Sequence, residues 1–169
     1  MFNSLKLIKI MKYFTKQEMI RCYRESKQQR CKECRLTTAV KRAPNDVDAN
    51  IEALVDNILD PAREHYGKPI YVNSGFRCPL HNTTVGGVRA SQHIQGEAAD
   101  ITAGSPEENH QLAKIIVQQG KFDQLIIYTN SSDLNPHFIH VSYKRTGGNR
   151  HRILRQVVGT NGYTEIKNI

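Results

Sequence analysis

The chain has 169 residues, 38% of them hydrophobic, which is enough for one domain with a sizeable core. Its formal net charge of +8 would suit nucleic acid, an anionic membrane surface or the polyanionic polymers of a cell wall, and charge alone does not separate these partners. Tryptophan is absent and aromatic residues are sparse, so we expect no base-stacking platform and no nucleic-acid partner. No apolar run approaches the roughly 20 residues of a membrane helix, so membrane insertion is not expected.

Residues 1–10 are predicted to be a disordered extension. Lys6 and Lys9 interrupt the apolar run that a signal peptide requires, so the sequence lacks a convincing secretory signal and synthesis in a cytoplasm is expected. Met11 is a candidate biological start. We expect residues 11–169 to form a single, monomeric domain.

A short helix and a basic loop are predicted at the start of this domain. Thr15 and Glu18 have the spacing of a capping box and predict a helix over residues 15–24. The polar segment that follows carries more basic than acidic residues. We interpret it as a solvated loop over residues 25–44 rather than as a dedicated anion-binding patch.

The chain contains four cysteines, Cys22, Cys31, Cys34 and Cys78. Cys31 and Cys34 have the spacing of a zinc or redox motif, but no second pair accompanies them. Reduced, unpaired thiols are therefore favoured over a structural metal. The sequence leaves open a disulfide that involves Cys22 or Cys78.

A longer helix is predicted to begin at Asn45 or Asp46. Its apolar residues follow the 3.6-residue period of an α-helix and are Val47, Ile51, Leu54, Val55 and Ile58. Pro61 is expected to kink or restart this helix, and Gly67 is expected to end it.

The middle of the chain alternates strands with a loop and a second long helix. Strands are predicted over residues 69–73 and 98–102, and the segment 79–95, rich in Asn, Gly and Thr, is predicted to be a long loop. Ser105, Pro106 and Glu108 form a complete helix start with a capping box, and Gly120 is a helix stop.

Two further strands and a tail complete the prediction. The strands cover residues 122–128 and 137–143 and are joined by a polar loop. A basic tail over residues 144–169 follows, in which residues 153–158 could add a hairpin.

Three side chains in this framework have the chemistry of metal ligands. His93 lies in the 79–95 loop, Asp100 lies on the strand that follows it, and His140 lies on the last long strand. Two imidazoles and one carboxylate suit Zn²⁺, and three protein ligands leave the fourth tetrahedral position open for chemistry. Gly96 would allow a sharp turn between the first two ligands.

The pattern His-x-x-Gly-x-Ala-x-Asp over residues 93–100, followed by Ile139-His140-Val141, resembles the zinc D-Ala-D-Ala carboxypeptidase family. That family includes phage endopeptidases that cut the stem peptides of peptidoglycan. The resemblance extends over residues 11–143 and includes Ser74-Gly75-Phe76-Arg77 and Phe122-Asp123-Gln124-Leu125-Ile126. It implies an α+β fold of the hedgehog/DD-peptidase type, with a central antiparallel sheet that carries the zinc and helices on one side.

The same resemblance implies roles for further residues. It assigns zinc ligation to His93, Asp100 and His140, and it places Arg77 against the substrate, where a guanidinium could bind a carboxylate or an oxyanion. Several family members have Asp or Glu three residues before the last ligand, where this chain has His137.

An imidazole can exchange protons near neutral pH, so His137 is the expected catalytic base. Asp133 and Glu97 are the other candidates, although Glu97 is expected to point away from the metal if His93 and Asp100 both face it.

These observations predict a zinc metallopeptidase that hydrolyses an amide bond in the peptide part of peptidoglycan, as a carboxypeptidase or as an endopeptidase. Without a clear signal peptide, it could be a phage or prophage lysin that acts on the bacterial cell wall. Two alternatives stay open. One is a zinc-containing cell-wall-binding module that has lost its catalytic base. The other is a basic nucleic-acid-binding protein with a zinc element at Cys31 and Cys34.

Overall fold

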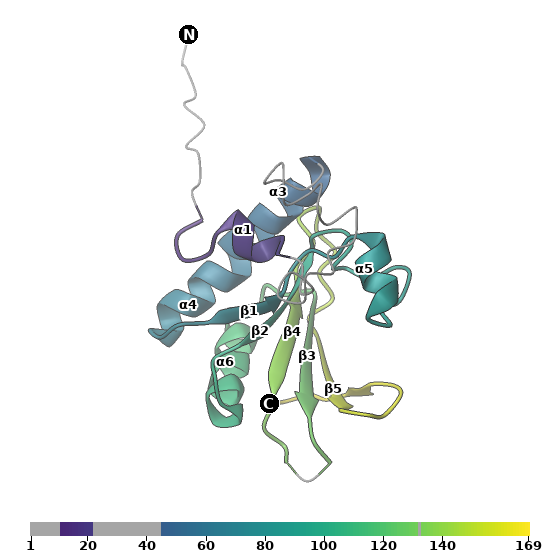
Figure 1. Cartoon of the computed structure of the whole chain (residues 1–169). Helices are drawn as coiled ribbons and strands as arrows, with labels where there is room; N and C mark the ends of the chain where they lie inside the picture. Colours follow the sequence, from purple (N-terminus) through teal and green to yellow (C-terminus); the bar gives the residue numbers. More distant parts are fainter. Residues whose placement is uncertain (1–10, 22–44, 132) are drawn as a thin grey trace.

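Six strands form one mixed sheet in the computed structural model, which describes residues 11–21, 45–131 and 133–169 (Figure 1). The sheet order is β1-β2-β4-β3-β5-β6. The strands are β1 (Tyr71–Ser74), β2 (Ala98–Thr102), β3 (Gln124–Thr129), β4 (Phe138–Ser142), β5 (Arg152–Val157) and β6 (Thr164–Glu165). The predicted α+β fold is confirmed. The sheet is mixed rather than antiparallel throughout, because β5 runs parallel to β3.

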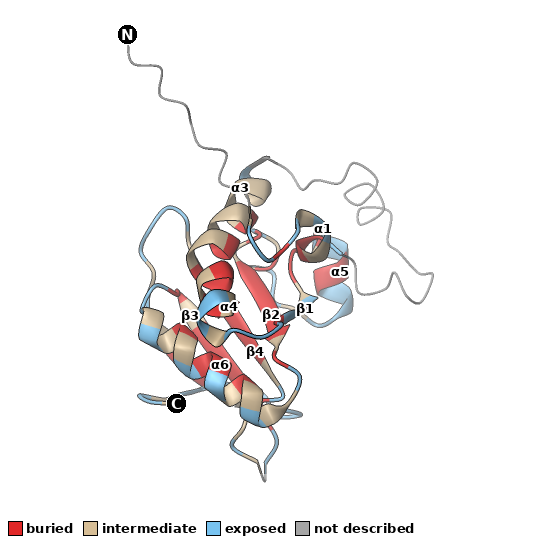
Figure 2. Ribbon diagram, turned by 90° about the vertical axis from the view of Figure 1, so that its left-hand side faces the viewer, coloured by how far each residue is buried: buried red, intermediate tan, exposed pale blue. Residues whose placement is uncertain are grey.

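The helices lie mainly on one side of this sheet, and Figure 2 shows that both they and the strands behind them contain buried residues. They are α1 (Lys16–Met19), α3 (Asn45–Leu54), the π-helical turn η2 (Val55–Leu59), α4 (Asp60–Tyr66), α5 (Pro79–Thr84) and α6 (Pro106–Gln119). The predicted capping box of α1 is present, with Thr15 and Glu18 bonded in both directions. Ser105 caps α6 as expected, but the carboxylate of Glu108 pairs with Lys68.

The long helix predicted from Asn45 to Gly67 is continuous through α3, η2 and α4. Pro61 lies in the first turn of α4 and has no N–H to donate to the preceding turn, and the π-helical segment comes directly before that turn. The helix ends at Gly67, which has a φ of 75° and is the kind of left-handed cap that glycine favours.

Strand alternation divides the sheet into a core face and an open face. Leu125 and Ile127 of β3 and Ile139 and Val141 of β4 are buried in the hydrophobic core. Because successive side chains of a strand point to opposite faces, the alternate residues of β3 and β4, which include His140, line the other face. Burial of each large apolar side chain stabilises the fold by roughly 1.5–3 kcal/mol.

Two segments differ from the sequence prediction. Residues 79–95 are not a loop throughout, because α5 occupies their first part. Cys78 caps that helix, with its Sγ accepting a hydrogen bond from the His81 N–H at 3.4 Å, and Pro79 occupies the first turn. In the tail, the predicted hairpin is formed by β5 and β6.

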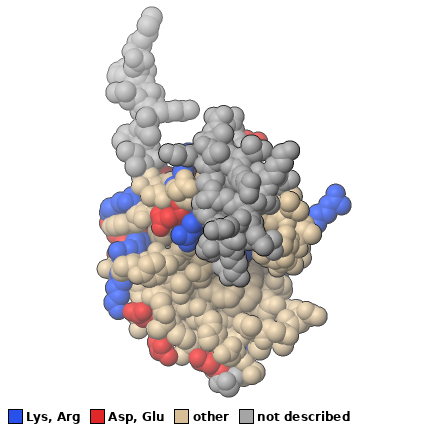
Figure 3. Space-filling model, viewed as in Figure 1, with Lys and Arg blue, Asp and Glu red and all other residues tan. Residues whose placement is uncertain are grey.

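The surface of the described residues carries mixed charge. On the face shown in Figure 3, Lys and Arg side chains are interspersed with Asp and Glu rather than gathered in one basic patch. Exposed ion pairs such as Lys12 with Glu64 contribute to this mixture. No helix in the described part of the chain is long and apolar enough to cross a membrane. The predictions for residues 1–10, for the 25–44 loop and for Cys22, Cys31 and Cys34 lie outside the described residues.

Candidate metal centre

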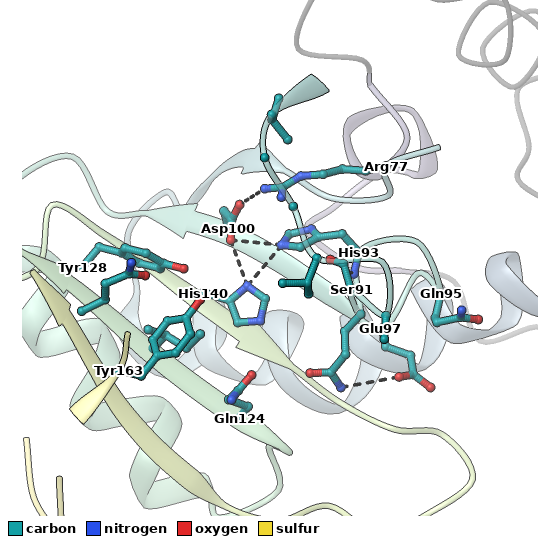
Figure 4. A pocket seen from close by; sticks show the side chains of 18 of the residues that line it. Arg77, Ser91, His93, Gln95, Glu97, Asp100, Gln124, Tyr128, His140 and Tyr163 are labelled. Atoms are coloured by element: carbon teal, nitrogen blue, oxygen red, sulfur yellow. Dashed lines mark hydrogen bonds and ion pairs between the residues drawn. The ribbon is translucent and has the colours of Figure 1, made fainter. Parts of the chain in front are cut away.

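His93, Asp100 and His140 meet at one point on the open face of the sheet (Figure 4). Asp100 on β2 lies directly opposite His140 on the neighbouring strand β4, so the backbone ladder sets their separation. His93 reaches them from the turn before β2. All three residues are buried, and each offers one ligand atom, the three atoms lying within 4.8 Å of one another.

The three ligand atoms form a nearly equilateral triangle. The distances are 3.1 Å from His93 Nε2 to His140 Nδ1, 3.0 Å from His140 Nδ1 to Asp100 Oδ1, and 3.2 Å from His93 Nε2 to Asp100 Oδ1. Tetrahedral zinc with bonds of about 2.0 Å holds its ligand atoms about 3.3 Å apart. The donor types and their spacing therefore fit a zinc ion.

The orientation of the His93 ring is set by the backbone beneath it. His93 Nδ1 lies 2.7 Å from the carbonyl oxygen of Gly75 and donates its proton there, which leaves the Nε2 lone pair directed at the cluster. A side chain at Gly75 would collide with α1, because its Cβ would lie 2.2 Å from the carbonyl oxygen of Met19.

The turn between the first two cluster residues also requires glycine. Gly96 has a φ of 71°, and a Cβ there would lie 2.6 Å from the carbonyl oxygen of Val47. The predicted sharp turn at Gly96 is therefore confirmed, and it brings the turn against α3.

The protonation states of the cluster suit metal binding. Burial lowers the pKa of His140 and favours its neutral ring, which has a lone pair to offer. Burial alone would raise the pKa of Asp100, but the interactions with His93 and His140 outweigh it and lower that pKa below its usual range. The site therefore presents a carboxylate and a neutral imidazole as donors.

Arg77, predicted to face the substrate, lies beside this cluster. Its Nη2 donates to Asp100 Oδ2, the carboxylate oxygen that does not face the imidazoles, and its Nε donates to Ser74 Oγ at 2.8 Å. Arg77 therefore orients Asp100, and it also lines the cavity above the cluster.

His137, predicted to be the catalytic base, is not brought to the cluster. It is exposed, it is absent from the residues that line the cavity, and its N–H donates to the carbonyl oxygen of Tyr128 at 2.7 Å. Residues three apart on a strand face opposite sides, which separates His137 from His140. The structure therefore does not support His137 as the base.

The two other base candidates also differ from their expected positions. Asp133 lies outside the cavity and accepts a hydrogen bond from the Asn135 N–H at 2.9 Å. Glu97, expected to point away from the site, lines the cavity, where its carboxylate lies 3.5 Å from Gln92 Nε2.

The cluster opens into a cavity of about 740 Å³ on the open face of the sheet. Its walls come from the 85–97 segment, from β3 and β4, and from the C-terminal segment. Tyr128 and Tyr163 are among the lining residues that sequence reasoning missed. Tyr128 lies on the same strand face as Gln124 and Ile126, so the alternation of β3 could have placed it in the cavity. No local sequence pattern indicates that Tyr163 lies there.

Comparison with known proteins agrees with this geometry. A family model described as Peptidase M15 matches residues 12–142, a range that contains the whole cluster and Arg77. The chain is also similar to the zinc D-Ala-D-Ala carboxypeptidase of Streptomyces albus G, with 55% identity over 38 residues. That match covers 22% of this chain and only 15% of the relative. Because the family model spans most of the chain, this protein belongs to the peptidase M15 family.

Proposed function

We propose that the protein is a zinc-dependent metallopeptidase that hydrolyses an amide bond in the peptide part of bacterial peptidoglycan. The observation that carries the proposal is the triangle of ligand atoms from His93, Asp100 and His140 at the wall of an open cavity. The Streptomyces relative, named for D-Ala-D-Ala, supports peptides of this class as substrates. A cavity of about 740 Å³ lies within the range of sites that enclose small ligands.

The side chains around the cluster have distinct roles in this proposal. Zinc held by the three residues would supply a Lewis acid and an activated water. Arg77 orients Asp100 through Nη2, and its Nη1 has no hydrogen-bond partner among the described residues. Because Arg77 also lines the cavity, its guanidinium would bind a substrate carboxylate or the oxyanion of the scissile carbonyl there.

A cell-wall-binding module without turnover is the alternative. The observation that favours it is that few side chains in the cavity could act as a catalytic base. Among the described residues, the only carboxylates that line the cavity are Asp100 and Glu97. Asp100 belongs to the cluster, and Glu97 lies against Gln92.

Incubation with purified peptidoglycan, followed by mass spectrometry of the released peptides, tests the proposal. We expect cleavage that a chelator abolishes and that added Zn²⁺ restores. The mass of each product would identify the bond and would separate a carboxypeptidase from an endopeptidase. Tight peptidoglycan binding without any product would instead favour the binding module.

Metal analysis on variants tests the ligand assignment independently of turnover. His93→Ala and His140→Ala should each lose zinc in dilute, chelator-containing buffer, because each removes one of three protein ligands. His65→Ala is the matched control, since His65 is exposed on α4. Unchanged zinc content in both cluster variants would refute the assignment.

A further inference from the structure

Tyr128 is held rigidly beside the cluster. It lies on β3 opposite Phe138 of β4, and the two rings are stacked with centroids 4.2 Å apart and an interplanar angle of 12°. His140 lies two residues further along β4 on the same face. Figure 4 shows the Tyr128 hydroxyl directed toward the cluster. The stacked ring thus fixes the position of a hydroxyl at this end of the cavity.

Tyr163 reaches the same place from the end of the chain. It directly precedes β6, which pairs with β5, and β5 pairs in parallel with β3. These two pairings carry the C-terminal segment back to Tyr128. The side chains of Tyr128 and Tyr163 both line the cavity. In Figure 4 both hydroxyls point to the side of the cavity where His140 lies.

Both hydroxyls can act as hydrogen-bond donors. Each phenol carries a single O–H that it can donate. Burial is the main reason that the pKa of Tyr128 is raised, so its hydroxyl stays protonated at neutral pH. The two side chains therefore present O–H donors to the cavity, on the β3 and β6 side of the cluster, while Arg77 approaches from the loop after β1.

We propose that the hydroxyl pair of Tyr128 and Tyr163 donates a hydrogen bond to the scissile carbonyl of the substrate and stabilises the oxyanion that develops there. This inference rests on the proposed function. A fixed donor aimed at developing charge in a partly enclosed site acts more strongly on the transition state than on the bound substrate. The C-terminal segment is then part of the active site, although it lies outside the 12–142 range matched by the family model.

Isosteric removal of each hydroxyl tests the pair. In Tyr128→Phe, Tyr163→Phe and the double variant, we expect zinc content and thermal stability to be retained. The kcat on a muropeptide substrate should fall with little change in KM, by up to about 10²–10³-fold, the loss typical of one oxyanion donor. Because both hydroxyls are proposed to act on the same oxyanion, the double variant should lose at least as much as the worse single variant. Tyr143→Phe is the matched control, since Tyr143 is half-buried and lies outside the cavity.

A binding measurement provides a second readout. A phosphinate pseudodipeptide mimics the tetrahedral intermediate, and its affinity should fall in parallel with kcat, while the affinity for the product peptide stays unchanged. If the wild type cleaves muropeptides and the double variant keeps kcat within about two-fold, far below the expected donor loss, the inference is overturned. A loss confined to KM would overturn it as well. If the wild type cleaves nothing, the proposed function itself fails.

Discussion

The carboxylate of Asp123 is completely buried and accepts two hydrogen bonds from the guanidinium of Arg150. Oδ1 lies 3.0 Å from Nε, and Oδ2 lies 2.6 Å from Nη2. The same carboxylate accepts a hydrogen bond from the Arg150 N–H at 3.0 Å and another from Gln92 Nε2 at 3.0 Å. Asp123 thus connects the start of β3 with the C-terminal segment and with the residue next to His93. The buried carboxylate of Asp123 therefore links three segments that contribute to the cavity wall.

Asp123→Ala is therefore expected to destabilise the fold. Removing one partner of a buried ion pair leaves the other groups unsatisfied, at a cost of roughly 3–5 kcal/mol. Because the Arg150 side chain is 43% exposed, we expect the lower end of that range. Urea denaturation would measure the loss. Glu165→Ala is the control, since its pair with Arg152 is exposed and should contribute less than about 1 kcal/mol.

Asp123 should also make stability depend on pH. Burial alone would raise its pKa, but the hydrogen bonds and charge of Arg150 outweigh this and hold the pKa below its ordinary value. A carboxyl with a lowered pKa in the folded state stabilises the fold above its unfolded pKa. That stability is lost as pH falls through the folded value. Lys144 and Arg150 are the basic side chains that face this carboxylate.

Denaturation midpoints measured from pH 7 to acid would show this dependence. The decline should begin near the ordinary Asp pKa of about 3.9 and continue below it. Asp123→Asn should show a shallower decline than the wild type. An identical acid profile in the two proteins would exclude Asp123 as a source of the pH dependence.

Gly96→Ala should be more damaging than an ordinary glycine substitution. An L residue at its left-handed φ costs about 1–2 kcal/mol, and the new Cβ would also collide with the backbone of Val47. Gly67→Ala is the matched control, because Gly67 has a similar φ of 75° and a methyl group added there would meet nothing within 4 Å. We expect Gly96→Ala to lower both thermal stability and zinc affinity, whereas Gly67→Ala should lower stability only. Equal effects would mean that the contact with Val47 is relieved easily.

The cluster could be predicted from the sequence because its information is local. His93, Gly96 and Asp100 lie within one short segment, and His140 lies on a strand whose alternation is clear. The α5 helix was missed because it is short and is capped by Cys78 rather than by a common capping residue. Tyr163 was missed because its position depends on the parallel pairing of β3 with β5, which no local periodicity encodes.

The assignment of His137 shows a different limit. It came from the spacing of residues in related enzymes, and in this chain the residue at that spacing lies just outside β4 and is exposed. His137 directly precedes β4, and its N–H continues the ladder to Tyr128. The strand that presents His140 to the cluster therefore leaves His137 exposed and outside the cavity.

Arg77→Lys should separate the handling of substrate from folding. Lysine retains the positive charge beside Asp100, but its single ammonium cannot bond Ser74 Oγ and Asp100 in the fixed fork of the guanidinium. We expect zinc content and the melting temperature to be retained while kcat/KM on muropeptides falls by about 10–10²-fold, the size of one charge-assisted hydrogen bond. Arg89→Lys is the control, because Arg89 is exposed and lies outside the cavity. Loss of zinc in Arg77→Lys would assign the arginine to the positioning of Asp100 alone. Full activity of Arg77→Lys would show that Arg77 takes no part in substrate binding or catalysis.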